Sequence, residues 1–326
     1  MQNSTNNIDV SIIIVNYKSW EHLKNCLLSI IGLHDLTIGI ETIVVDNQSK
    51  DGKLAQFTQE FPQVNFISNT GNNGFANGCN FGASKAKGNY FLFLNPDTII
   101  NSKVIESFFD FSKLNRNVGI TSCLQKKVSG GYEKSNRSFL TLSSLFGFTR
   151  AIQKLLSSKV PELEKAVLYT DWVSGSLVFI SKEWFQQING WNEDYWMYYE
   201  DMDLSKKVHQ SNGKVVLLEN VEIVHNHGGA SRLNIKTSAL TKTEVLISKH
   251  VYIENHLKGF KKFLAHFLLI INNIITKIFL GAIGIILFFI PKMRLNVYLL
   301  IKMMKYYFVR FIKGNWLSSN SMNQIK

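Results

Sequence analysis

Asp97 is the residue best placed in this sequence for metal chemistry. It closes the turn Asn95-Pro96-Asp97, directly after the apolar run Tyr90–Leu94. A carboxylate at the end of a buried strand points into the crevice of an α/β sheet, where its oxygens suit Mg²⁺ or Mn²⁺ beside a diphosphate. The same turn can also be simple punctuation between elements, so both interpretations stay open.

Two further positions at predicted strand ends suit ligand binding. Asp46, after Thr42–Val45, can hydrogen-bond a nucleobase or a ribose hydroxyl, or it can cap a turn. His225 and His227 lie beside two glycines, and either imidazole can complete a metal site. The alternative for both histidines is an ordinary surface position.

An acidic cluster supplies candidates for a catalytic base. Glu200, Asp201 and Asp203 begin a predicted helix, where the helix dipole stabilises carboxylates and capping is the alternative role. Burial beside aromatic side chains raises a carboxyl pKa towards that of a useful base. The aromatic residues before the cluster, which can also form a wall for an acceptor, are Tyr195, Trp196, Tyr198 and Tyr199.

The segment Asn69–Gly82 is dense in glycine and asparagine. Its glycines allow a ligand to approach the backbone closely, and its amides are donors at a helix start. The segment matches neither the G-x-G-x-x-G pattern of dinucleotide-binding folds nor the P-loop spacing. Tight packing of a helix on a sheet at Gly74 and Gly78 is the alternative.

These residues need a sheet whose strands end at one edge. Helices predicted after Ser19, an expected N-cap, and after Ser181 alternate with apolar, β-branched runs. The pattern predicts an α/β fold with a mostly parallel central sheet, flanking helices and a ligand crevice at the carboxyl ends of the strands. Ser129–Ala166 is expected to be a loop or helical excursion over the site. The predicted strands are Val10–Val15, Thr42–Val45, Val64–Ile67, Tyr90–Leu94 and two short strands ending at His225.

The distribution of charge divides the chain. The net charge is +12 over 326 residues, yet eleven Lys or Arg and no Asp or Glu follow residue 256, which leaves 25 basic against 24 acidic residues before it. We therefore expect a nearly neutral domain over residues 1–256 and a basic helical segment over 257–326. Cys26, Cys79 and Cys123 fit buried reduced thiols. The polar start of the chain lacks a secretory pattern, so a cytoplasmic location is expected.

The basic segment is also the most apolar part of the chain. Polar residues around Asn272 interrupt its apolar runs, and basic residues alternate with aromatic ones beyond Pro291. This pattern predicts contact with an anionic membrane surface, either by helices lying on it or by one spanning helix. A pair of helices packed on the soluble domain is the alternative. Because the basic residues are interleaved with lipid-like apolar runs, nucleic-acid binding is not expected.

Taken in order, these motifs resemble glycosyltransferase family 2, whose members have the GT-A fold, and within it the rhamnosyltransferase-like branch. The resemblance extends from Val10 to Ser231, and its specificity lies in the shared order and spacing of the motifs. The motifs are Ser11–Tyr17, Val45–Ser49, Asn72–Asn80, Leu94–Asp97, Gly175-Ser176, Gly190–Glu193, Glu200–Leu204 and His225–Ser231.

The resemblance implies a role for each candidate residue. Asp201 would be the base of an inverting transfer, and Asp97 and His225 would hold a divalent cation, Mg²⁺ or Mn²⁺. Asn95 stands where the family's D-x-D motif has its first aspartate, as is common in this branch. Acceptor-side roles would fall to Trp191, Tyr198 and Glu200. The residues that would bind the nucleotide-sugar donor are Asn16, Asp46, Asn72, Gly74, Asn77, Asn80, Asn95 and Asp97.

The implied activity is transfer of rhamnose from dTDP-rhamnose to a lipid-linked or cell-surface polysaccharide acceptor at the cytoplasmic face of the cell membrane. A UDP-hexose or UDP-N-acetylhexosamine donor is the alternative within the family. The missing G-x-G-x-x-G turn disfavours a dehydrogenase. The intact set of Asp97, Asp201 and His225 disfavours a non-catalytic nucleotide-binding membrane scaffold.

Overall fold

The computed structural model describes residues 8–34, 36–133, 137–142, 166–226 and 234–325. The chain divides into two compact units, which are described in turn. The first comprises Met1–Phe139, Glu162–Glu193 and Glu200–Ala230, and the second comprises Leu140–Pro161, Asp194–Tyr199 and Ser231–Lys326. The domain boundary predicted after residue 256 is based on amino-acid composition alone, and it stays a prediction.

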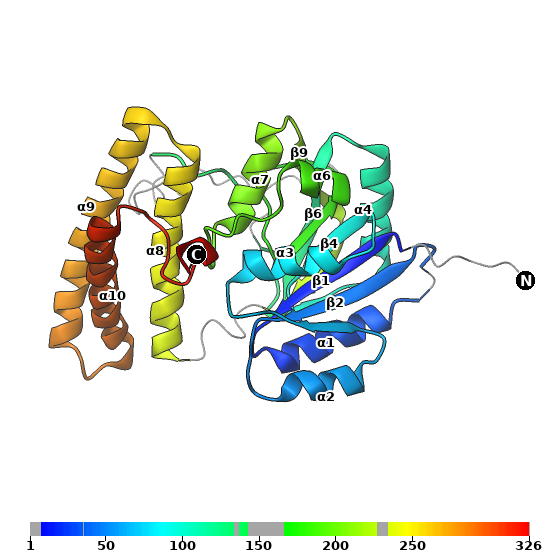
Figure 1. The fold of residues 1–326 in the computed structure, drawn as a ribbon, viewed down its shortest axis with the longest axis horizontal. Coiled ribbons are helices and arrows are strands. Elements are labelled where there is room, and N and C mark those ends of the chain that lie inside the picture. Colours follow the sequence, from blue (N-terminus) through cyan, green and yellow to red (C-terminus); the bar gives the residue numbers. More distant parts are fainter. Residues whose placement is uncertain (1–7, 35, 134–136, 143–165, 227–233, 326) are drawn as a thin grey trace, which may run out of the picture. The chain divides into compact units, whose positions relative to one another are not determined.

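One twisted sheet forms the centre of the first unit (Figure 1). Its described strands run in the order β3-β2-β1-β4-β8-β6-β9-β5, and β7 pairs with β9. The strands β1 to β4 pair in parallel, as do β6 and β9, whereas β8, β5 and β7 pair antiparallel with their neighbours. The strands are β1 (Val10–Asn16), β2 (Ile40–Asp46), β3 (Asn65–Ser68), β4 (Tyr90–Leu94), β5 (Thr98–Ile99), β6 (Val118–Lys127), β7 (Val167–Tyr169), β8 (Leu177–Ser181) and β9 (Lys214–His225).

Helices cover both faces of this sheet because its strands are apolar on both sides. In β1, Ile12 and Ile14 join the core on one face, and Ile13 and Val15 join the core on the other. The first face is covered by α1 (Trp20–Ile31), α2 (Lys53–Glu60) and α4 (Ser102–Leu114). The second is covered by α3 (Phe75–Lys85), α6 (Lys182–Gln187) and α7 (Glu200–Gln210).

Glycines let α3 approach the sheet closely. A Cβ added at Gly78 would lie 2.7 Å from Val15 Cγ1, and one added at Gly82 would lie 2.5 Å from Ile13 Cγ2. The helix start at Gly74 has a φ of 96°, a conformation that favours glycine. Gly78 therefore serves helix–sheet packing, the alternative considered for it from the sequence.

The predicted α/β fold with flanking helices is confirmed, and two details differ from expectation. Parallel pairing is confined to part of the sheet. The two short strands expected before His225 are a single strand, β9, because the polar interruption near Glu219 is a bulge. Cys123 pairs with Leu218 and the next residue, Leu124, pairs with Glu222, so the intervening residues bulge without ending the strand.

The three cysteines are free and buried, as expected, and burial raises the pKa of the Cys26 thiol to about 12. Ser181 caps α6 through a hydrogen bond from Trp184 N to its hydroxyl, whereas Ser19 stands at the start of α1 without a side-chain cap bond. Much of the expected excursion Ser129–Ala166 lies outside the described residues.

The second unit is helical. Its long helices α8 (Ile235–His256), α9 (Gly259–Ile286) and α10 (Pro291–Lys313) lie side by side, and the short α11 (Met322–Ile325) follows (Figure 1). Gly281 and Gly284 on α9 allow close contact with α10, since an added Cβ at Gly281 would lie 2.6 Å from Leu300 Cδ2. Fully buried His250 on α8 hydrogen-bonds His266 on α9 and Tyr307 on α10, so a polar link joins all three.

Helices α9 and α10 expose large apolar side chains, and exposed lysines stand among them on α10. Within the described residues one helix, α9, is long and apolar enough to cross a membrane, a test of length and composition only. Several large apolar side chains on these two helices are exposed, among them Phe263, Phe267, Ile275, Phe279, Ile301, Phe308 and Phe311.

Candidate functional site

Asp97 and His225 meet because β5 pairs with the end of β9. Thr98 stands opposite His225 in this short ladder, and the backbone N–H of Asn226 donates to the carbonyl oxygen of Asp97 over 2.8 Å. His225 Nε2 then lies 3.2 Å from Asp97 Oδ1. The His225 side chain is buried, whereas the Asp97 side chain is partly exposed, so the pair can be reached from solvent on the Asp97 side.

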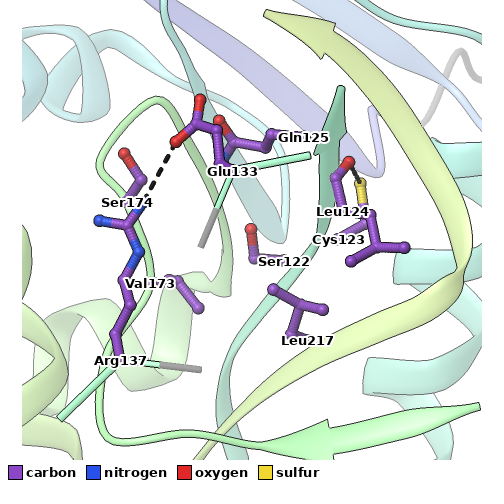
Figure 2. A pocket seen from close by; sticks show the side chains of 9 residues that line it. All are labelled: Ser122, Cys123, Leu124, Gln125, Glu133, Arg137, Val173, Ser174 and Leu217. Carbon is purple, nitrogen blue, oxygen red and sulfur yellow. Dashed lines mark hydrogen bonds and ion pairs between the residues drawn. The ribbon is translucent and has the colours of Figure 1, made fainter. Parts of the chain in front are cut away.

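Glu133 is a third member of this cluster that the sequence interpretation missed. Its Oε1 lies 2.6 Å from His225 Nδ1, and its Oε2 accepts a 3.1 Å hydrogen bond from Arg137 Nη2. Figure 2 shows the Glu133 and Arg137 side chains pointing toward each other at the edge of a small cavity of about 10 Å³. Arg137 also stacks its guanidinium over the Trp172 ring, 4.6 Å from the centroid. Four charged groups therefore alternate in sign from Asp97 to Arg137.

The carboxylates on both sides decide the charge of His225. Burial opposes a charged imidazole, but hydrogen bonds to Asp97 and Glu133, together with their negative charges, outweigh it and raise the pKa of His225 to about 9. At neutral pH the ring is therefore an imidazolium between two acceptors, and a metal ion that binds Nε2 would have to displace the proton from that nitrogen.

Asp97 and His225 fit a divalent cation that takes most of its coordinating atoms from a bound substrate and from water. The described residues contain no group of three or more His, Cys, Asp or Glu side chains arranged to hold a metal ion. Mg²⁺ sites, however, commonly use one or two protein ligands and complete their shell with substrate phosphates and water. Glu133 at Nδ1 is the kind of outer partner that fixes the tautomer of a metal-ligating histidine. Asp97 Oδ1 and His225 Nε2 are the atoms that would face the ion.

Asp201 lies at the first turn of α7 and is partly buried. Its Oδ2 accepts a 3.1 Å hydrogen bond from Gly175 N and its Oδ1 a 2.8 Å bond from Met202 N. Burial raises the pKa of Asp201, although the Gly175 hydrogen bond and the Arg137 charge oppose this effect. Arg137 thus acts on both Glu133 and Asp201, which lie in distant parts of the chain.

Glu200 is buried beside Asp201 and has a different character. Its Oε2 has no hydrogen-bond partner among the described residues. Burial, followed by the charge of Asp201, raises the pKa of Glu200 well above its ordinary value. The carboxyl group of Glu200 therefore favours its protonated form more than an exposed glutamate does.

Asp46 and Asn16 lie side by side at the carboxyl ends of β2 and β1. Asp46 is buried and accepts hydrogen bonds from Ser49 N at 3.0 Å and Ser49 Oγ at 2.5 Å, as a turn cap does. Asn16 Oδ1 accepts from Ser19 N in the same way. The donor-binding role expected for both residues stays a prediction, and the capping alternative accounts for these contacts.

The asparagines of α3 bind another part of the protein. Asn77 Nδ2 donates to Glu193 Oε2 at 3.0 Å. Asn80 Nδ2 donates to Trp191 O and Glu193 Oε1, and Asn80 Oδ1 accepts from Trp191 N. These amides fasten α3 to the Gly190–Glu193 turn. Asn72 and Gly74 precede α3, and Asn95 N donates to Ser176 O at the end of β4.

The residues expected on the acceptor side have different surroundings. Trp191 is 2% exposed and packs edge-on against Phe75 and Phe93 in the core. Tyr198 belongs to the second unit and has a left-handed φ of 72°. His227 lies outside the described residues. The acceptor-side roles of Trp191, Tyr198 and Glu200 stay predictions.

Two family models match parts of the chain that together extend over residues 11–227. Residues 11–166 match the model described as glycosyl transferase family 2, and residues 156–227 match the model described as the N-terminal domain of galactosyltransferase. Together they extend from β1 to just beyond His225.

Curated relatives match about two thirds of the chain. A low-salt glycan biosynthesis hexosyltransferase of Haloferax volcanii is 29% identical over 67% of this chain and 67% of its own length. Rhamnosyltransferase WbbL of Escherichia coli is 31% identical over 60% of this chain and 75% of its own. The N-acetylglucosaminyl-diphospho-decaprenol L-rhamnosyltransferase of Mycobacterium tuberculosis is 22% identical over 66% and 75%.

Solved structures share the fold. GalNAc-T7, determined with UDP, GalNAc and Mn²⁺, superposes with a TM-score of 0.55 at 17% identity over 77% of this chain and 51% of that one. S. aureus TarS superposes with a TM-score of 0.50 at 18% identity over 78% and 68%. The described unit therefore has the GT-A fold expected from the sequence.

The hydrogen bonds of Asn80 predict a structural effect. Replacing Asn80→Ala removes three hydrogen bonds, one of them to a carboxylate, so we expect the free energy of unfolding to fall by about 3 kcal/mol. Asn73→Ala, which removes one exposed bond to Thr70, is the matched control and should change stability little. Urea denaturation measures both variants, and equal midpoints for the two would contradict this role of Asn80.

Proposed function

Because this chain belongs to glycosyltransferase family 2, in its rhamnosyltransferase-like branch, we propose that it transfers rhamnose from dTDP-rhamnose with inversion. The chain is a glycosyltransferase, and the donor and acceptor are the proposed parts. The observation that carries the proposal is the meeting of Asp97 and His225, 3.2 Å apart, at the carboxyl end of the sheet. Two of the three relatives named above are rhamnosyltransferases, which supports rhamnose over the UDP-sugar alternative.

In the proposed complex, Asp97 and His225 face the diphosphate of the donor. A bound Mg²⁺ or Mn²⁺ would offset the negative charge that grows on the departing diphosphate. Glu133 keeps the His225 ring in place through Nδ1, and Arg137 balances the charge of Glu133. The buried network thus holds both ligand atoms before the donor arrives, so little reorganisation is needed.

Asp201 is the proposed base. Its carboxylate removes the proton of an acceptor hydroxyl as that oxygen forms a bond to the anomeric carbon, and the bond from this carbon to the diphosphate breaks. The nucleoside diphosphate leaves from the opposite face, which inverts the anomeric centre. The hydrogen bonds from Gly175 N and Met202 N hold the Asp201 carboxylate while its raised pKa favours accepting a proton.

The proposed acceptor is a lipid-linked saccharide at the cytoplasmic face of the cell membrane. The name of the mycobacterial relative describes a decaprenol-linked substrate, and the second unit of this chain carries the exposed apolar side chains of α9 and α10. Basic residues accompany these side chains, and all eleven charges after residue 256 are positive. Such a surface suits anionic lipid headgroups.

Replacing Asp201→Asn should lower kcat about 10²- to 10⁴-fold with little change in donor affinity, because the amide keeps the shape but accepts no proton. Free dTDP released from dTDP-rhamnose with membrane extract measures kcat, and calorimetry measures donor affinity. Asp110→Asn, an exposed change on α4, is the control. Wild-type activity should also fall on acidification above the ordinary aspartate range, since burial raises the pKa of Asp201. Retained turnover in Asp201→Asn would refute its role, and release of UDP alone in a donor panel would refute dTDP-rhamnose.

Replacing Asp97→Ala should weaken Mn²⁺-dependent binding of the donor nucleotide. We expect a loss of about 10- to 100-fold, and a similar loss for Glu133→Gln because Glu133 orients His225. Calorimetry with dTDP, with and without Mn²⁺, measures the effect apart from catalysis. An unchanged Mn²⁺ contribution in Asp97→Ala would remove the metal from this site.

Replacing Phe308→Ser and Phe311→Ser together should reduce membrane binding at least tenfold. These side chains are 67% and 90% exposed, so the folded unit loses little packing while the surface loses two apolar contacts. Sedimentation with vesicles containing phosphatidylglycerol measures binding. Leu114→Ser, an exposed apolar change on α4, is the control, and equal sedimentation of all three proteins would contradict a lipid surface here.

A further inference from the structure

The residues directly before Asp201 belong to the helical second unit. The segment Asp194–Tyr199 is part of that unit, and the chain returns to the first unit at Glu200. The proposed base is therefore two residues beyond a segment that the C-terminal helices hold.

One face of α8 contacts the segment Asp194–Tyr199 at three points. Ser248 Oγ donates to Met197 O at 2.9 Å, Tyr252 packs its ring 6.1 Å from that of Tyr199, and Asn255 Nδ2 donates to Asp194 Oδ2 at 3.2 Å. Positions 248, 252 and 255 follow helical spacing, so a single face of the helix makes all three contacts.

The C-terminal end of the chain adds a fourth contact. Asn323, on α11, donates from Nδ2 to Asp194 Oδ1 over 2.8 Å. Asp194 thus receives one amide on each of its carboxylate oxygens, from α8 and from α11. The tail is itself attached to α8, where Ser318 and Asn320 donate to Glu244.

The backbone of the segment Asp194–Tyr199 is strained at its last two residues. Tyr198 and Tyr199 have φ angles of 72° and 68°. These values lie in the left-handed region, which residues other than glycine rarely adopt. Two such residues in succession persist only where surrounding contacts determine the conformation. The next residue, Glu200, is the first residue of α7, and Asp201 is the second.

We infer that Asp194, Asn255 and Asn323 are positioning residues for Asp201, because they fix the strained turn from which the helix of the base starts. This inference rests on the proposed role of Asp201. It gives the C-terminal unit a part in catalysis that is separate from any contact with lipid.

The double variant Asn255→Ala/Asn323→Ala tests this inference in the full chain. We expect kcat to fall about tenfold or more with dTDP-rhamnose and membrane extract, while the affinity for dTDP-rhamnose by calorimetry changes less than twofold. Asn320→Ala is the matched control, since it removes a hydrogen bond between the same tail and α8 without touching Asp194. Its kcat should stay within twofold of wild type.

Combination with Asp201→Asn separates positioning from a general loss of structure. If the amides act through the base, the double variant should cause no further loss in the Asp201→Asn background. An unchanged kcat in the double variant, a parallel loss of donor affinity, or an undiminished effect in the Asp201→Asn background would each overturn the inference. Retained turnover in Asp201→Asn alone would instead refute the base itself.

Discussion

The pairing of β5 with β9 is the constraint on which the site depends. A ladder of two residues, with Thr98 opposite His225, joins the turn after β4 to the far end of a long strand. The Thr98 hydroxyl closes that turn by donating to Asn95 O at 2.6 Å, and Asn226 N donates to Asp97 O. Backbone contacts therefore bring Asp97 and His225 close together, and their side chains span the short distance that remains.

Charge alternation makes this buried cluster tolerable. Asp97, His225, Glu133 and Arg137 alternate in sign, so the row has no net charge when His225 carries its proton. Buried ion pairs contribute little net stability, because desolvation offsets their attraction, but removal of one member leaves a neighbour uncompensated. The cluster therefore contributes less to folding free energy than to holding Asp97 and His225 in place, the two residues proposed to bind the cation.

The sequence predicted what depends on local pattern and missed what depends on distant pairing. Apolar runs located β1, β2, β3 and β4, and the turn at Asp97 was found because it directly follows such a run. Glu133 was not predicted because it lies in a polar stretch without periodicity, and its partner His225 is 92 residues away in the sequence. The contacts of Asn80 with Trp191 and Glu193 span more than 110 residues, so no local pattern could predict them, and its donor-binding role stays a prediction. Strands as short as β5 have no period to detect.

Three carboxylates stand close together at the start of α7, and their surroundings give them different capacities as a base. Asp203 is 1% exposed and Glu200 is 8% exposed, so neither is open to a substrate hydroxyl in this conformation. Burial and the charge of Asp201 also raise the pKa of Glu200. Asp201 remains partly exposed and keeps its carboxylate fixed by two backbone N–H groups. Of the three carboxylates, Asp201 is therefore the one whose exposure and fixed orientation fit the proposed role of base.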